Sequence, residues 1–167
     1  ATLELNVAAD HDLSFTGKFR DTINVVKRGI GIQRLLGDGS DWNGTLFIEE
    51  GVVWIGSNTV VNTDVRVFDG GQIIPLDTNV NVRHVTLSGL GNAVGRGALL
   101  FENDKHDTWN GDITIDGYAR IGAYTGGIMS KTINGVIAGS GTLNIWAGGG
   151  ALNHENVYVI TKPATFK

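Results

Sequence analysis

The sequence predicts an all-β fold, a right-handed single-stranded parallel β-helix, from a repeated strand-turn-strand unit and from the lack of any convincing helical stripe. Residues 42–56 and 109–122 both read aromatic, polar residue, Gly, alternating strand, acidic turn closed by Gly, and second strand. With one residue fewer in the second copy, the copies start 67 positions apart (109 minus 42). This interval corresponds to three solenoid turns of roughly 20 residues each. A β-sandwich would not give near-copies of one unit at a long fixed interval.

Short segments with period-two alternation mark strands that bury one face. In chain order they are 3–7, 13–15, 46–48, 65–67, 80–82, 85–87, 113–115 and 143–145. Turn residues separate them at 9–12, 37–41, 69–71, 88–92, 103–107 and 148–150. Residues 1–5 lack the basic and apolar stretches of a signal peptide. Either such a peptide was removed or the chain is an excised module, and we favour the module. From its length we expect residues 1–167 to form a single β-helix domain, excised from a larger secreted protein.

Composition excludes several classes of partner. Hydrophobic residues make up 41% and charged residues 18%, so the chain is not disordered by composition, and no apolar run is long enough to span a membrane. The net charge of −4 and the pI near 5.5 argue against a nucleic acid or an anionic membrane as partner. The chain has no cysteine, so it forms neither disulfides nor thiolate metal sites. We expect no cofactor, and a neutral partner is favoured.

Several segments resemble a known family. Residues 26–37, the Trp42-Asn43-Gly44 step, residues 50–56 and 109–122, and the joining strand 135–143 are similar to the autotransporter-associated β-strand repeat. That resemblance implies a parallel β-helix from a bacterial protein that is secreted or lies on the cell surface. The pattern of this repeat gives almost no information about activity, because a fold does not determine a function. The non-repetitive tail at 153–160 departs from it.

In size and pattern, the chain also resembles the small xylan-binding β-helix modules of carbohydrate-binding module family 89. Such modules are attached to hydrolases of plant polysaccharides. The resemblance implies that the chain is a monomeric module tethered to a glycoside hydrolase and that it binds a polysaccharide, with xylan favoured.

Strand alternation provides candidate ligand-binding residues. If Leu46 and Ile48 point inward, Phe47 points outward, and by the same argument Trp54 lies outside its strand. Flat aromatic faces on a rigid ladder suit pyranose rings. In the second copy the residue aligned with Trp54 is Arg120. The predicted ligand-binding residues are Trp54, Phe47, Tyr118, Arg120, Trp146 and Tyr124.

Trp42 and Trp109 call for a different interpretation. Both occupy the aromatic position of the repeat, directly before Asn-Gly. An aromatic that recurs at a solenoid corner closes the edge of the core. We expect the two tryptophans to be structural and to stack on one another.

Catalytic and metal sites receive little support. The candidate carboxylate pairs are Asp10 with Asp12, Glu49 with Glu50, and Asp104 with Asp107. Adjacent carboxylates on a strand face opposite ways, and the other two pairs lie in turns, where Asp is an ordinary turn former. Residues 103–107 could hold calcium through oxygen ligands, although the internal Lys105 opposes it. The four histidines are scattered, so we predict no catalytic or metal-binding residue.

These observations favour a non-catalytic carbohydrate-binding module for a β-linked plant cell-wall polysaccharide. Its outward aromatics would raise the local concentration of a tethered hydrolase on its substrate. The main alternative is a structural passenger fragment of a bacterial surface adhesin or autotransporter. A small polysaccharide lyase or hydrolase is a third interpretation.

Overall fold

A computed structural model describes residues 1–126, 129–148, 156–160 and 164–166, with side chains through residue 148. Its strands are β1 (Thr2–Asn6), β2 (Asp12–Phe15), β3 (Asn24–Arg28), β4 (Ile32–Leu35), β5 (Thr45–Ile48), β6 (Gly51–Ile55), β7 (Val60–Val67), β8 (Gly71–Pro75), β9 (Asn79–Gly89), β10 (Leu99–Phe101), β11 (Asp107–Tyr124), β12 (Met129–Ile133), β13 (Ile137–Gly139), β14 (Thr142–Gly148), β15 (Asn156–Ile160) and β16 (Ala164–Phe166). The described residues contain no helix, and hence none that could cross a membrane.

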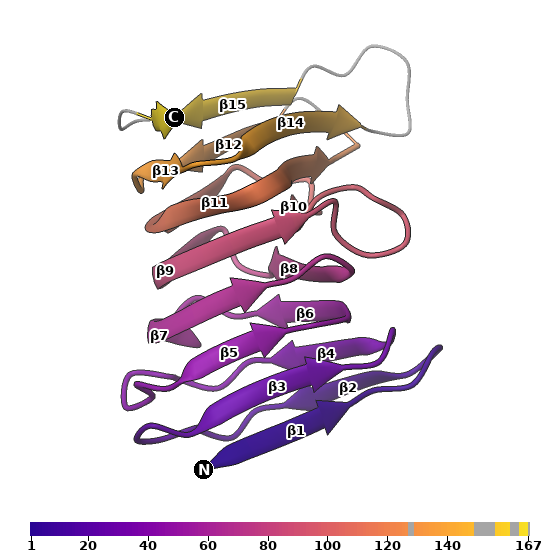
Figure 1. Ribbon diagram of the computed structural model, residues 1–167, viewed down its shortest axis with the longest axis vertical. Coiled ribbons are helices and arrows are strands. Elements are labelled where there is room, and N and C mark those ends of the chain that lie inside the picture. The colour runs from indigo at the N-terminus through magenta and orange to yellow at the C-terminus, as the bar shows by residue number, and fades with distance from the viewer. Residues whose placement is uncertain (127–128, 149–155, 161–163, 167) are drawn as a thin grey trace.

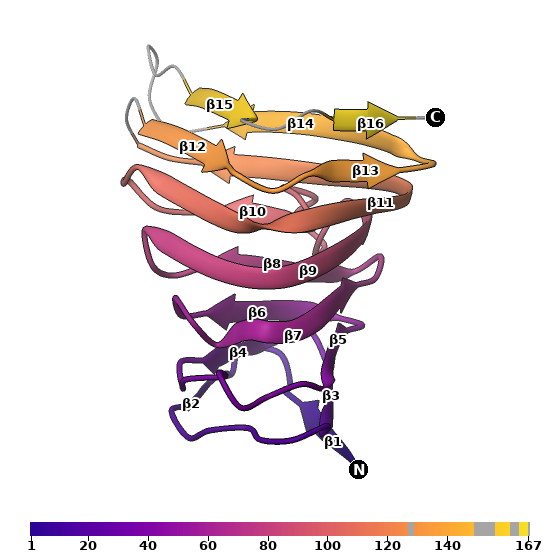
Figure 2. The ribbon, with the colours of Figure 1, turned by 90° about the vertical axis from the view of Figure 1, so that its left-hand side faces the viewer.

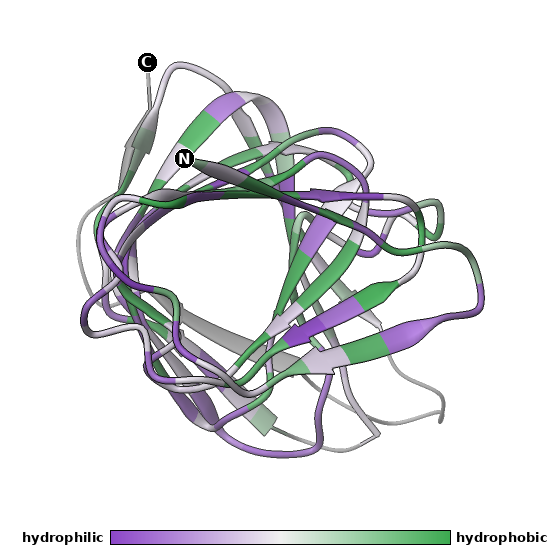
Figure 3. Ribbon diagram, turned by 90° about the horizontal axis from the view of Figure 1, so that it is seen from below, coloured by the Kyte–Doolittle hydropathy of each residue, from purple (hydrophilic) through white to green (hydrophobic). Residues whose placement is uncertain are grey.

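The strands stack as a parallel β-solenoid of about seven turns, which confirms the predicted architecture. In Figure 1 the chain passes rightward on the near side and leftward behind as it rises from the N-terminus, so the winding is right-handed. Seen from below, the coils overlie one another around a common axis (Figure 3). Each coil therefore pairs its backbone with the coils above and below it.

Three faces run along the solenoid, and Figure 2 shows the side on which β7, β9 and β11 bend from one face to the next. The first face consists of β1, β3, β5, residues 64–67, 84–87 and 112–115, β13 and β16. The second face consists of β2, β4, β6, β8, β10, residues 118–124 and β14. The third face consists of residues 79–82 and 107–110 with β12 and β15.

Columns of inward side chains build the core. On the first face Leu46 pairs with Val65, Val65 with Val85, and Val85 with Ile113. These four side chains are at most 1% exposed. Each such side chain contributes about 1.5–3 kcal/mol through burial, so a short alternating strand is stable only between two neighbouring coils.

The register confirms that the two sequence copies lie three coils apart. Thr45 pairs with Asp64, Asp64 with His84, and His84 with Asp112, which is three steps along the first face. The interval from 45 to 112 is again 67 residues.

The glycines that close the acidic turns, Gly51 and Gly117, have φ angles of 74° and 69°.

Trp42 and Trp109 are both fully buried, at 0% exposure. The prediction that they stack on one another is wrong, because three coils separate them by about 14 Å at the usual strand spacing. Trp42 instead packs on Phe19, with ring centroids 4.7 Å apart, and donates a hydrogen bond from Nε1 to the Ile23 carbonyl at 2.7 Å. Each tryptophan therefore closes its own coil.

The alignment of Trp54 with Arg120 is also wrong. Through Ile74 and Leu100, the register places Gly122 in the column of Trp54, two residues beyond Arg120. The turn after Ile115 is longer than the turn after Ile48, not shorter. A shift of two residues preserves the inward and outward alternation, so the hydrophobic pattern does not detect it.

In the first coil, β1 pairs only with β3 and β2 only with β4 among the described residues. Leu3, Leu13 and Phe15 occupy positions opposite buried residues of the next coil, yet they are 37%, 51% and 37% exposed. Within the described residues, the outer edges of β1 and β2 and these apolar side chains are therefore uncovered.

Two lysines are buried inside the corners. Lys27 donates from Nζ to the carbonyl oxygens of Arg28, Gly29 and Glu50 at 2.9, 2.5 and 3.1 Å. Burial lowers the pKa of Lys27 to about 8, against the opposing attraction of the Glu50 carboxylate. Its ammonium satisfies carbonyls that the turn would otherwise leave without a donor.

Candidate ligand-binding groove

The outer side of the second face carries a second apolar cluster. Val52, Ile74 and Leu100 point away from the core, yet they are only 7%, 2% and 2% exposed. Partly buried side chains pack around them, namely Ile32, Trp54, Tyr124 and Trp146. Outward residues on a solenoid normally meet solvent, so another segment must cover this part of the face.

Residues 90–97 supply that cover. They lie between β9 and β10 and form the wide loop beside these strands in Figure 1. Ile73 pairs with Leu99, 26 residues later, whereas Val53 pairs with Ile73, 20 residues later. The loop is thus an insertion in a single coil, and we call it the 90–97 loop.

Hydrogen bonds fix the 90–97 loop at both of its edges. Gln72 Nε2 donates to the Gly97 carbonyl at 2.7 Å, and Arg120 Nη1 donates to the Gly95 carbonyl at 2.5 Å. Within the loop, the Gly97 amide donates to the Leu90 carbonyl at 2.9 Å. The loop is therefore a preformed wall attached to β8 and β11.

A cavity of about 210 Å³ lies between this wall and the sheet. Its lining residues are Ile32, Val52, Trp54, Gln72, Ile74, Asn92, Val94, Arg96, Leu100 and Glu102. A trough of about 370 Å³ on the β2 side shares Ile32, Val52 and Asn92 with it. A second trough of about 360 Å³, beside Tyr124, shares Glu102 with it. The three hollows follow one another along the solenoid axis and adjoin at these shared residues, and we call them together the second-face groove.

Trp54 lies in the middle of this groove with a guanidinium on its ring. The Arg34 Cζ atom is 4.8 Å from the ring centroid, a cation–π distance. Arg34 is held in turn by Asp12, with Nε to Oδ1 at 2.8 Å and Nη2 to Oδ2 at 2.6 Å. The hydrogen bond from Arg34 lowers the pKa of Asp12 below its usual value. The pair therefore stays ionised and presents little net charge to a ligand.

The indole N–H of Trp54 is buried, and no acceptor lies within hydrogen-bonding distance of it among the described residues. A buried donor without a partner costs about 1–3 kcal/mol. A hydroxyl of a ligand or a water molecule in the adjacent cavity would relieve this cost.

Tyr124 and Trp146 form a second aromatic pair farther along the groove. Their ring centroids are 6.4 Å apart and their planes differ by 3°. The Arg96 Cζ atom lies 4.0 Å from the centroid of the Tyr124 ring, and Arg96 Nη1 is 3.3 Å from Glu102 Oε1. The Trp146 ring lies against Gly148, where a Cβ atom would come within 2.4 Å of it. The second face thus carries two places where a guanidinium lies on an aromatic ring, Arg34 on Trp54 and Arg96 on Tyr124.

The structure brings three of the six predicted ligand-binding residues together, namely Trp54, Tyr124 and Trp146. Trp54 and Trp146 share one outward column and are four coil steps apart, or about 19 Å at the usual strand spacing. Arg120 is a positioning residue, because it holds Gly95 and donates from Nε to Asn144 Oδ1 at 2.8 Å.

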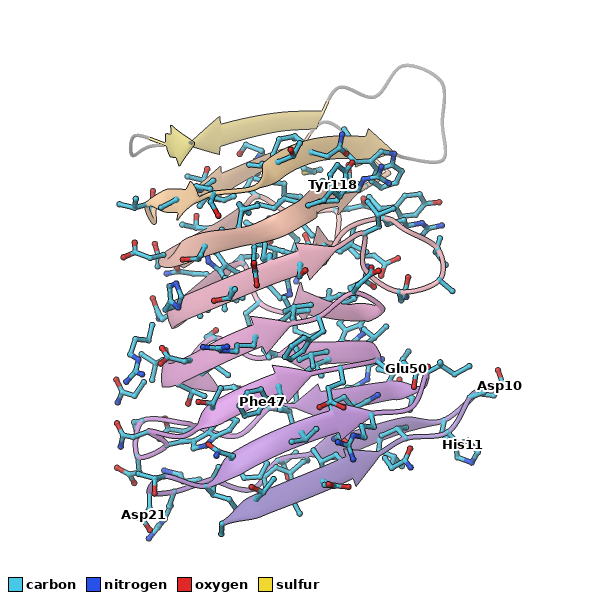
Figure 4. All side chains as sticks on the ribbon, in the orientation of Figure 1. Asp10, His11, Asp21, Phe47, Glu50 and Tyr118 are labelled. Carbon is cyan, nitrogen blue, oxygen red and sulfur yellow. The ribbon has the colours of Figure 1, made fainter. Side chains whose placement is uncertain are left out.

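The remaining two predicted residues lie elsewhere in Figure 4. Phe47 projects outward from β5 on the first face, as predicted, but not into the groove. Tyr118, 42% exposed, stands at the start of the second-face segment of β11. Sequence reasoning missed Arg34, Arg96 and the wall itself. The long interval between Ile73 and Leu99, with glycines at 89, 91, 95 and 97, is the signal that could have indicated a loop.

Most of the candidate carboxylates are already engaged. Glu49 accepts a hydrogen bond from Arg28 Nε at 2.7 Å, and Asp104 accepts one from the Gly126 amide. Asp107, 2% exposed, pairs with Lys131 at 2.5 Å. These contacts favour structural roles for these acidic side chains.

The loop considered for calcium holds an ammonium group. Lys131 Nζ donates to Asn103 O, Asn103 Oδ1, Lys105 O and Asp107 Oδ2, at 2.5 to 3.0 Å. A lysine from the next coil therefore occupies the centre of this group of oxygen atoms. No group of three or more His, Asp or Glu side chains suited to a metal occurs in the described part of the chain.

The second-face groove thus combines apolar and aromatic surface with a guanidinium, a carboxylate and amide groups. This combination suits a ligand that has both apolar C–H faces and neutral hydrogen-bonding groups. No protein-family model, curated protein or solved structure matches this chain.

Proposed function

We propose that the protein is a non-catalytic glycan-binding module whose ligand lies along the second-face groove. The observation that carries the proposal is the alignment of Trp54 and Trp146 in one outward column, with Tyr124 beside Trp146 and adjoining hollows alongside. The coils repeat every 4.8 Å or so, which is comparable to the length of one β-linked pyranose. A glycan parallel to the solenoid axis would therefore meet equivalent positions on successive coils.

The charges of the groove favour a neutral glycan. Arg34 is paired with Asp12, and Arg96 lies beside Glu102. The groove residues that the structure describes form no strongly basic strip to attract a polyanion, consistent with the net charge of −4. We propose a β-linked plant cell-wall polysaccharide, with xylan as the first candidate because of the resemblance to xylan-binding modules. The module would act in a secreted protein by raising the local concentration of an attached hydrolase on its substrate.

The test is affinity electrophoresis and calorimetry on soluble xylan, mixed-linkage glucan, mannan and pectin. We compare wild type, Trp54→Ala, Trp146→Ala and the control Phe47→Ala, which removes an outward aromatic from the first face. Loss of one stacking contact should weaken binding by about tenfold, equivalent to about 1.4 kcal/mol. Near-ultraviolet circular dichroism and thermal melts establish that each variant is folded. Binding that is unchanged by both tryptophan substitutions but lost in Phe47→Ala would place the site on the first face.

A structural role is the second candidate, and one observation favours it. Among the described residues no strand pairs with the outer edges of β1 and β2, beside exposed Leu3, Leu13 and Phe15, and further β-strands could pair there. A passenger segment of a surface adhesin would use such an end for stacking. Absence of binding across the glycan panel, together with concentration-dependent association in sedimentation velocity that Leu13→Lys abolishes, would favour this role.

A further inference from the structure

The cavity beneath the 90–97 loop differs from the troughs on either side of it. The hydrogen bonds from Gln72 and Arg120 hold its wall in place, so the cavity exists without a ligand. Its floor is Val52, Ile74 and Leu100, which are nearly buried already. A preformed hollow avoids the entropy cost of ordering a loop when a ligand binds.

The polar groups of the cavity suit a small neutral polyol. Asn92, Arg96 and Glu102 line its sides with planar amide, guanidinium and carboxylate groups, which can form paired hydrogen bonds with neighbouring hydroxyls. The positive charge of Arg96 and the negative charge of Glu102 balance each other, so the cavity favours a ligand without net charge. Trp54, whose buried N–H has no acceptor among the described residues, forms part of the same lining.

The size of the cavity matches one sugar unit. About 210 Å³ equals the liquid volume of roughly seven water molecules, which is comparable to a single pentose or hexose. The troughs continue on both sides, through shared Asn92 in one direction and shared Glu102 in the other. A glycan chain that follows both troughs would pass the cavity with an internal residue. The cavity is therefore placed to receive a group that projects from the middle of a chain.

We infer that this cavity binds a single neutral sugar carried as a branch on the glycan, so that the protein prefers branched chains to bare ones. The inference rests on the proposed function and identifies the class of glycan. Trp54 and Trp146 would contact the backbone of the chain, while Asn92, Arg96 and Glu102 would bind hydroxyls of the branch. The 90–97 loop would then be the specificity element of the groove.

Calorimetry on two matched pairs of polymers tests the inference. These are arabinose-branched xylan and the same xylan after enzymatic removal of arabinose, and galactose-branched mannan with its debranched form. We expect the wild type to bind one branched polymer about tenfold or more tightly than its debranched partner, the range expected for one added group in a complementary pocket.

Two substitutions locate the preference. Leu100→Phe fills the cavity from its floor, and Glu102→Gln keeps the shape of the rim while it removes a charged acceptor. Each should lower affinity for the branched polymer much more than for the debranched one, so that the two affinities converge, although Glu102 also lines the trough beside Tyr124. Glu49→Gln, on the first face, is the control and should change neither. If Leu100→Phe fails to fold, Glu102→Gln alone decides the matter.

The outcomes separate this inference from the proposed function. Equal wild-type affinity for branched and debranched polymers overturns the inference while the binding function stands. Competition by short unbranched oligosaccharides as effective as that by branched ones would make the cavity a pocket for a chain end, and this also overturns it. Absence of binding to these four polymers and to mixed-linkage glucan and pectin contradicts the proposed function and the inference together.

Discussion

The two buried tryptophans allow a comparison of one substitution at two equivalent positions of the repeat. Trp42 and Trp109 both precede Asn-Gly, are 0% exposed, and lie three coils apart. Their indole N–H groups differ. Trp42 Nε1 donates to the Ile23 carbonyl at 2.7 Å, whereas Trp109 Nε1 is buried with no acceptor among the described residues. We predict that Trp42→Phe destabilises the fold more than Trp109→Phe does.

The expected difference follows from the hydrogen bonds. Both substitutions remove the same ring volume, so the cost of lost packing largely cancels between them. Trp42→Phe also loses a hydrogen bond with a net value of about 0.5–1.5 kcal/mol, while Trp109→Phe removes an unsatisfied donor that costs about 1–3 kcal/mol. The two free energies of unfolding should therefore differ by about 2 kcal/mol or more. For a chain of this size, that difference corresponds to about 4–8 °C in Tm.

Urea unfolding followed by far-ultraviolet circular dichroism measures both free energies, provided that the two variants have equal m values. Trp42→Leu and Trp109→Leu serve as controls, because they remove the N–H with a different loss of volume. Equal destabilisation at the two positions, or a larger loss at Trp109, would refute the hydrogen-bond argument.

Three further predictions concern the corners of the solenoid. Between pH 8 and 10.5 the folded chain has lost the Lys27 proton while the unfolded chain still binds one, so the free energy of unfolding should rise with pH by at most about 1.4 kcal/mol per unit. Urea titrations at pH 8, 9 and 10 should show this slope in wild type and not in Lys27→Met. Lys131→Met leaves the buried Asp107 carboxylate without its ammonium and should cost about 3–5 kcal/mol in thermal melts, with partial recovery when Asp107→Asn is added. Gly117→Ala should cost about 1 kcal/mol for its positive φ, because no atom lies within 4 Å of the new Cβ. Gly51→Ala should cost more, because its Cβ would lie 2.4 Å from the Gly29 carbonyl oxygen, and equal costs would contradict this geometry.

Much of the fold could be predicted from sequence because the information is local. Alternation in segments such as Leu46–Ile48 and Ile113–Ile115 identifies the inward residues, and the interval between the two copies predicts the number of coils that separate them. The pairing of Trp54 could not be predicted in the same way. A two-residue shift leaves alternation intact, so Arg120 and Gly122 are equivalent by pattern and are distinguished only by the actual turn length.

The groove depends on contacts that no local pattern encodes. Arg34 contacts Trp54 because the chain completes one coil in the 20 residues between them, which places the two side chains on adjacent strands. Arg96 contacts Tyr124 from the inserted 90–97 loop. The outward direction of Trp54 could therefore be predicted, whereas its partners and the cavity beside it could not. For the same reason, the sequence could not show that Phe47 lies on a different face from Trp54. Alternation predicts whether a side chain points inward or outward, but not on which face of the solenoid it lies.

The 90–97 loop is inserted at one corner of the solenoid, so its sequence can change without changing the coils that form the core. Backbone pairing and the inward columns continue past the insertion, because Leu99 rejoins the ladder opposite Ile73. An evolving lineage could therefore lengthen, shorten or replace this segment without redesigning the coils. A protein engineer could do the same, by keeping the solenoid as a rigid scaffold and exchanging the loop beside Trp54 to alter which ligands fit the groove.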